Sequence, residues 1–213
     1  MKWGRTGSFW GIAVLALPFS SGCARAVLPS HYMISAKGSL AAAQASKMSA
    51  PMIEAAPSSP WLATARVIAV HQLCDAEQLP FVLRTGRSAV SVVFRSWRIN
   101  YEAPEPGARW DAILVIGPDD TKLILWSGRK REEISLSLSD RVEQLSTLKK
   151  NADRFIGAPY VLPMHISPHA RFDTCIEIFR DALAAGWSQF YLETEYSTAV
   201  DVLNGFPKEE STR

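Results

Sequence analysis

The chain has little cysteine, no long hydrophobic segment and no acidic residue before Glu54. Three cysteines are too few for the disulfide frameworks that stabilise small secreted domains. The longest apolar segment, from Phe9 to Phe19, falls well short of the roughly 20 residues that cross a bilayer as a helix. A net charge of only +2 gives no indication of a basic surface that would bind a nucleic acid. A multi-span membrane protein is therefore excluded, and no nucleic-acid partner is expected.

The common catalytic motifs are also missing. The sequence contains no G-x-S-x-G, no H-E-x-x-H, no C-x-x-C and no glycine-rich phosphate loop. Its adjacent acidic pairs, Asp119-Asp120 and Glu132-Glu133, are typical of turns and solvated hairpin ends, and not of two carboxylates that face each other across a substrate. We therefore expect a protein that is not an enzyme and that holds no cofactor.

Residues 1–23 have the features of an export signal. A basic start and a short apolar core, Phe9 to Phe19, are followed by Ser20-Ser21-Gly22-Cys23. This ending resembles the lipobox of bacterial lipoproteins, although Ser20 stands where leucine is most common. The resemblance implies that Cys23 is lipidated and begins the mature chain. Alanine at position 24, in place of aspartate, then implies the periplasmic face of the outer membrane.

Two other interpretations of this segment stay open. Ala24-Arg25-Ala26 is an A-x-A pattern, at which ordinary cleavage would release a secreted protein. The segment could also be retained as a membrane anchor. All three interpretations place the rest of the chain outside the cytosol.

Residues 24–60 have the composition of a flexible tether. From Ser35 to Pro60 the segment is rich in alanine, serine and proline and has no aromatic residue. It lacks the large apolar side chains that offset the entropy cost of ordering a chain. We therefore expect a coil over residues 24–60 and a single globular domain over residues 61–213.

Periodicity predicts a mixed α/β (α+β) fold for this domain. Residues 61–73 are predicted as a helix, with a strand over Val67–Val70 as the alternative. Hairpins are predicted within residues 81–99 and 112–126. From Ala112 the order is β-β-α-β-α-β, which indicates two layers, a small sheet covered by two helices. The Arg129–Glu133 segment is expected to be a solvated loop, and no internal repeat is visible.

The segment from His165 to Leu192 resembles the C-terminal signature of the ExbD/TolR family, the periplasmic accessory subunits of proton-driven energy-transducing motors. That signature is a strand, a short polar turn, an aromatic residue opening an amphipathic helix, an Ala-Gly stop and a closing strand. Phe172 has the aromatic position and Ala185-Gly186 the stop. With the preceding hairpin and helix, the resemblance covers residues 112–193. It implies a periplasmic interaction or scaffold module.

The chain departs from the family at two points. Ser167 stands where an acid is usual. Family members also carry an aspartate for proton flow on an N-terminal transmembrane helix, and such an intramembrane carboxylate is the functional element of that helix. No carboxylate precedes Glu54 here, which implies a periplasmic fold without the motor part.

Cys74 and Cys175 leave two alternatives. If Cys23 carries a lipid, they are an even pair in an oxidising compartment, and a disulfide between them would close a loop of about 100 residues. They are equally compatible with buried free thiols.

A metal site is the basis of the second candidate function. His165 and His169 are of a residue type that binds zinc or copper. Because one falls in a predicted strand and the other in a turn, they share no helical face. The two candidate functions are thus an envelope protein with a lipid anchor in the membrane, whose partner is another envelope protein or peptidoglycan, and an unrelated secreted or periplasmic ligand- or metal-binding protein. The sequence does not indicate an oligomeric state.

Overall fold

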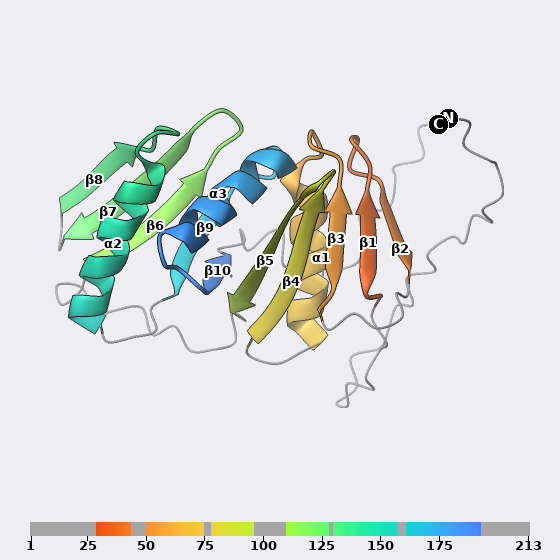
Figure 1. Ribbon diagram of the computed structural model, residues 1–213, viewed down its shortest axis with the longest axis horizontal. Coiled ribbons are helices and arrows are strands. Elements are labelled where there is room, and N and C mark those ends of the chain that lie inside the picture. The colour runs from red at the N-terminus through yellow and green to blue at the C-terminus, as the bar shows by residue number, and fades with distance from the viewer. Residues whose placement is uncertain are drawn as a thin grey trace, which may run out of the picture.

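The computed structural model describes residues 29–43, 50–74, 78–95, 110–127, 130–156 and 161–192. These residues form one mixed sheet of ten strands with three helices (Figure 1). The predicted mixed α+β class is confirmed, although the sheet is larger than expected and the helix near residue 61 covers it together with the two helices expected after Ala112. In chain order the elements are β1 (His31–Ile34), β2 (Leu40–Ala43), β3 (Met52–Ala55), α1 (Trp61–Cys74), β4 (Gln78–Thr85), β5 (Ser88–Arg95), β6 (Trp110–Ile116), β7 (Thr121–Ser127), β8 (Lys130–Ser135), α2 (Arg141–Ile156), β9 (Leu162–Ile166), α3 (Phe172–Ala184) and β10 (Phe190–Leu192).

Three strands lie in the segment that was expected to be a tether. β1 pairs with β2 in antiparallel orientation and with β3 in parallel orientation, and β3 continues the sheet to β4. Tyr32, Ile34, Ile53 and Ala55 are buried. The expectations of a coil over residues 24–60 and of a domain that starts at residue 61 are therefore wrong for these strands. Composition misleads here because a short strand needs only two inward side chains when its neighbours supply the rest of the core.

Two further elements decide points that the sequence left open. Trp61–Cys74 is a helix, so the alternative strand over Val67–Val70 is wrong. Lys130–Ser135 is the strand β8, paired with β7, where a solvated loop was expected. The order from Trp110 is consequently β-β-β-α-β-α-β. The hydrophobicity pattern does not predict β8, because nearly all its side chains are exposed. Backbone pairing with β7 holds the strand in place.

All three helices cover the same face of the sheet. The sheet order is β2-β1-β3-β4-β5-β10-β9-β6-β7-β8. Buried residues of neighbouring strands lie opposite one another: Leu83 is paired with Val90, and Phe94 is paired with Phe190. Because paired residues point to the same side, one face carries the core. The sheet twists, so this face is turned toward the viewer near α2 and away near α1 (Figure 1). None of the helices within the described residues is long and apolar enough to cross a membrane.

The chain contains an internal repeat. The first repeat consists of β1, β2, β3, α1 and β4, and the second of β6, β7, β9, α3 and β10. In each, a strand hairpin is followed by a strand parallel to the first, a helix and another parallel strand. β8 and α2 are inserted between β7 and β9 of the second repeat, and β5 lies between the two repeats in the sheet. The expectation that no repeat exists is therefore wrong.

Burial, and not residue identity, is what the repeats share. A constant offset in residue number relates Trp61 to Phe172 and Ile53 to Met164, and all four are buried. The same offset pairs unlike residues such as His71 with Ala182, which hid the repeat from the sequence. The six buried positions of α3 all correspond to buried positions of α1: Phe172, Cys175, Ile176, Ile178, Phe179 and Ala182 match Trp61, Thr64, Ala65, Val67, Ile68 and His71.

The repeats meet at the beginnings of α1 and α3, which lie close together in Figure 1. The Trp61 amide donates to the Ala170 carbonyl and the Phe172 amide to the Ser59 carbonyl, each at 2.9 Å. Corresponding bonds of 3.1 Å run from Leu62 to Pro168 and from Asp173 to Pro57. Each of these four bonds thus has its counterpart in the other repeat, and the Trp61 and Phe172 rings stack at 6.2 Å. The junction has a local two-fold pseudosymmetry.

Candidate functional site

The helix amino termini at this junction are closed to ligands. The amides of Trp61, Leu62, Phe172 and Asp173 all donate to carbonyls of the opposite repeat. The first amides of a helix are its usual anion-binding groups because they have no partner within the helix. Here the backbone of the other repeat supplies those partners, so the junction is a structural contact.

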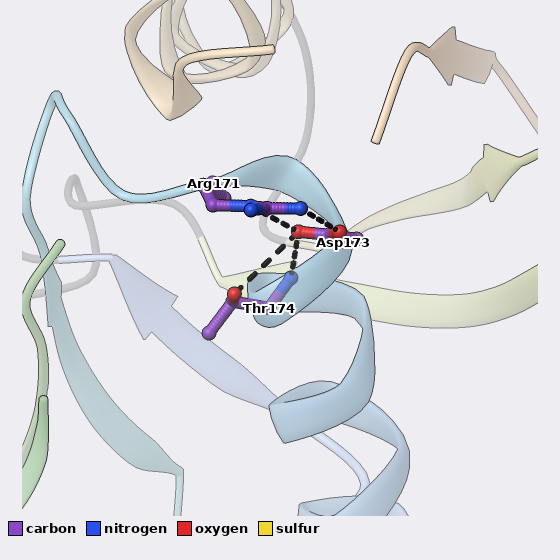
Figure 2. A network of polar contacts seen from close by, with 3 residues as sticks. All are labelled: Arg171, Asp173 and Thr174. Carbon is purple, nitrogen blue, oxygen red and sulfur yellow. Dashed lines mark hydrogen bonds and ion pairs between the residues drawn. The ribbon is translucent and has the colours of Figure 1, made fainter. Parts of the chain in front are cut away.

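An ion pair beside the junction distinguishes the two repeats. Figure 2 shows the Arg171 guanidinium lying alongside the Asp173 carboxylate, with Thr174 on the other side of that carboxylate. Arg171 donates through Nε at 3.1 Å and through a terminal nitrogen at 2.6 Å, and the Thr174 amide donates at 2.8 Å. Burial alone would raise the pKa of Asp173, but these donors outweigh it and hold that pKa below its usual range. The corresponding residues of the first repeat, Pro60 and Leu62, cannot form such a pair.

Cys175 is a free thiol, completely buried in the first turns of α3. A Cys74–Cys175 disulfide, one of the two alternatives from the sequence, is therefore not formed in this structure. Cys74 ends α1, about 20 Å along the helix from Trp61, whereas Cys175 lies one turn into α3. α1 and α3 begin side by side, so the two residues lie at different distances from the junction, and a disulfide requires α-carbons within about 7 Å.

His165 and His169 occupy different environments. His165 is half-buried in β9 on the face opposite Met164 and Ile166, and His169 is exposed in the turn that follows. Among the described residues, no three or more His, Cys, Asp or Glu side chains gather where they could hold a metal ion. The residues proposed for lipidation or cleavage, Cys23 and Ala24-Arg25-Ala26, lie outside the described part of the chain.

His71 and Arg141 are buried polar residues that have structural partners. The Tyr32 hydroxyl and the His71 Nε2 atom are 2.8 Å apart, and the His71 ring lies edge-on to Phe81. Arg141, at the start of α2, has its Nε 3.3 Å from the Asp181 carboxylate on α3. A buried charge is tolerated when it is paired. Arg141 thus ties α2 to α3, a role that its sequence context does not indicate.

An open groove of about 400 Å³ lies between α2 and the outer strands β7 and β8. Its rim is acidic, and hydrogen bonds from Ser139 and Ser137 lower the pKa of Asp140. A groove with an apolar floor and an acidic rim suits contact with apolar groups, and its described residues include no pair of facing catalytic groups. The floor consists of Leu123, Leu125, Ile134 and Leu148, and the rim of Asp140, Glu143, Gln144, Thr147 and Asn151.

The two edge strands of the described sheet differ sharply in charge. β8 presents Lys130, Arg131, Glu132 and Glu133 in succession, all exposed, with Arg131 and Glu133 ion-paired. β2, at the other edge, is Leu-Ala-Ala-Ala and carries no charge. Charged side chains protect an edge strand against pairing with another chain. β2 lacks this protection and is the candidate interaction surface.

No family model matches the chain, and no curated protein matches it either.

Proposed function

We propose that the protein is a non-catalytic, lipid-anchored component of the bacterial cell envelope, with a folded part that is an interaction module similar to the periplasmic domain of the ExbD/TolR family. A lipid on Cys23 holds it at the periplasmic face of the outer membrane. The module contacts an envelope protein or peptidoglycan.

The segment from β9 to β10 carries this proposal. It has the order that the resemblance implies, which is a strand, a polar turn, Phe172 opening a helix, Gly186 ending it and a closing strand. Phe172 is fully buried, and Gly186 has a φ of 94°. The Gly186 and Trp187 amides donate to the carbonyls of Leu183 and Ala182, which is the Schellman arrangement. Each feature of the pattern thus has a structural role.

The position of the segment adds support. β9 and β10 are parallel neighbours joined by α3, and the hairpin β6–β7 extends the same sheet beyond β9. The first repeat supplies a second segment of this kind, β3-α1-β4. Both segments lie in one sheet whose uncharged edge strand, β2, is the candidate interaction surface, which suits a scaffold.

Fractionation of cells that express the full chain tests the anchor. We expect the unmodified protein to take up radiolabelled fatty acid and to sediment with membranes. Cys23→Ser should lose the label and leave the membrane fraction, whereas the matched control Cys74→Ser should keep both. A Cys23→Ser variant that stays labelled and membrane-bound would contradict lipidation at this residue.

Purified peptidoglycan tests one of the two partners. The Cys23→Ser protein should co-sediment with peptidoglycan if the module binds the polymer directly. If it does not, cross-linking in intact cells should capture an envelope protein. Failure of both experiments would contradict the interaction role while leaving the result on the anchor intact.

A further inference from the structure

The internal repeat identifies a position beside β2 that no strand of the described residues fills. In the second repeat the hairpin β6–β7 is extended by β8, which pairs antiparallel with β7. β2 is the counterpart of β7, and no described strand pairs with its outer edge. Among the described residues, the position equivalent to that of β8 is thus vacant, and a strand there would run antiparallel to β2.

The side chains around this edge are apolar and accessible. Leu40 on β2 is 36% exposed and Met33 on the neighbouring β1 is 54% exposed. Leu40 lies opposite Ile34 and Ala41 opposite Met33, so the two large side chains project from opposite faces of the sheet. A strand added at β2 would cover apolar groups on both faces.

Charge and symmetry favour a second copy of the same β2 as that strand. A two-fold axis perpendicular to a sheet makes two equivalent edge strands antiparallel, which is the orientation of the vacant position. Self-pairing of β2 brings no charges together. Self-pairing of β8 about the same kind of axis, at Glu132 or at Glu133, would place that glutamate opposite its own copy, and like charges opposite each other destabilise a sheet.

We propose that two copies of this chain associate through antiparallel pairing of their β2 strands, so that the two sheets become continuous. The proposal rests on the edge strands and is independent of the lipid anchor and of the family resemblance.

Site-specific photo-cross-linking of the full chain in cells tests the pairing. Two differently tagged copies are co-expressed with a photoreactive amino acid in place of Ala42, on the β2 edge, or of Glu133, on the β8 edge. We expect a product of twice the chain mass that carries both tags from position 42 and not from position 133. Cross-linking of position 42 only to other proteins, or to none, would overturn the proposal.

A charge exchange separates pairing from misfolding. Ala41 is exposed, so Ala41→Lys and Ala41→Glu should fold, but each should lose the two-tag product because like charges meet across the axis. Co-expression of the Lys variant with the Glu variant should restore it. Ser135→Lys, on β8, should change nothing. Persistence of the product in Ala41→Lys, or no restoration in the mixed pair, would overturn β2 pairing.

Discussion

At the scale of single residues, Asp173 is the carboxylate whose environment is best defined. Its side chain is 29% exposed and accepts hydrogen bonds from Arg171 and from the Thr174 amide. Because these donors hold its pKa below the ordinary value of 3.8, the folded state favours the ionised form. Asp173 therefore stabilises the fold above the ordinary pKa, and this contribution is lost as the pH falls through the lowered pKa.

Replacement of Asp173 by Asn should lower the free energy of unfolding by about 0.5–1 kcal/mol near neutral pH, as expected for a partly exposed ion pair. The difference from the unmodified protein should shrink as the pH falls below about 4, where the unfolded state is protonated first, and should vanish once the folded state is protonated as well. Urea denaturation followed by circular dichroism at several pH values measures this. A difference that stays constant down to pH 2 would show that the charge of Asp173 is not responsible.

Cys175 should be chemically inert in the folded protein. Burial raises the pKa of its thiol, and the thiolate is the form that attacks alkylating reagents. In a Cys23→Ser/Cys74→Ser background, we expect no modification by iodoacetamide at pH 8 under native conditions and complete modification in denaturant, as mass spectrometry would show. Rapid native labelling would place this side chain outside the core.

Among the elements, α3 matches its sequence prediction most closely. The resemblance implied an amphipathic helix here, and of its apolar stripe Phe172, Ile176 and Phe179 are fully buried and Leu183 is partly buried. Phe179 contacts the Phe94 and Phe190 rings with centroids 5.7 and 5.1 Å away. It is therefore the central contact between α3 and the middle of the sheet.

Truncation of Phe179 to Ala should cost about 3–5 kcal/mol, because it removes a fully buried ring and leaves a cavity. Arg180, the exposed neighbour on the same helix, is the matched control, and Arg180→Ala should be nearly silent. Both values come from urea denaturation of the purified proteins. Equal effects would mean that the stripe does not pack as described.

Gly186 should resist substitution for a conformational reason. With a φ of 94°, it has a backbone conformation that β-branched residues rarely adopt, whereas a side chain there would meet only Lys149 at 4.0 Å. We expect Gly186→Val to lower the melting temperature by several degrees, and Gly186→Asn to be milder because Asn tolerates this region better. Equal effects of Val and Asn would point to another cause.

The elements also show how far the sequence could be interpreted. α2 and α3 were predictable because each buries one stripe, and the Gly186 stop because glycine has a specific backbone role, whereas α1 is buried nearly all round and left a strand as the alternative. β3 was not predictable, because strands elsewhere in the chain hold it in the sheet, and β8 was not, because nearly all its side chains are exposed. The start of α3, which the resemblance placed at Phe172, has no local capping signal. Arg171 provides no side-chain cap, and carbonyls of the first repeat accept the bonds instead. Local patterns cannot predict partners that only the tertiary fold brings together.

For the molecule as a whole, the strands before residue 58 should be indispensable. Ile53 lies between β1 and β4 in register with Tyr32 and Leu83, and all three side chains are buried. Their loss would expose one side of the core.

A chain that begins at Ser58 should therefore be much less stable than one that begins at Ala24. Removal of several buried side chains costs on the order of 5 kcal/mol or more, which is comparable to the total stability of many domains. Urea denaturation compares the two chains. Equal midpoints would show that β1 and β3 contribute nothing to the core.

The reciprocal hydrogen bonds at the junction also set the order of events when the chain folds. Residues 57–62 form their bonds with residues 168–173, so α1 cannot begin in its final form until nearly the whole sheet has been synthesised. Bringing these segments together closes a loop of about 110 residues, and proteins dominated by such distant contacts fold in milliseconds to seconds, not microseconds. The first repeat, although complete in sequence early in synthesis, must wait for the second to arrive before its helix start is satisfied.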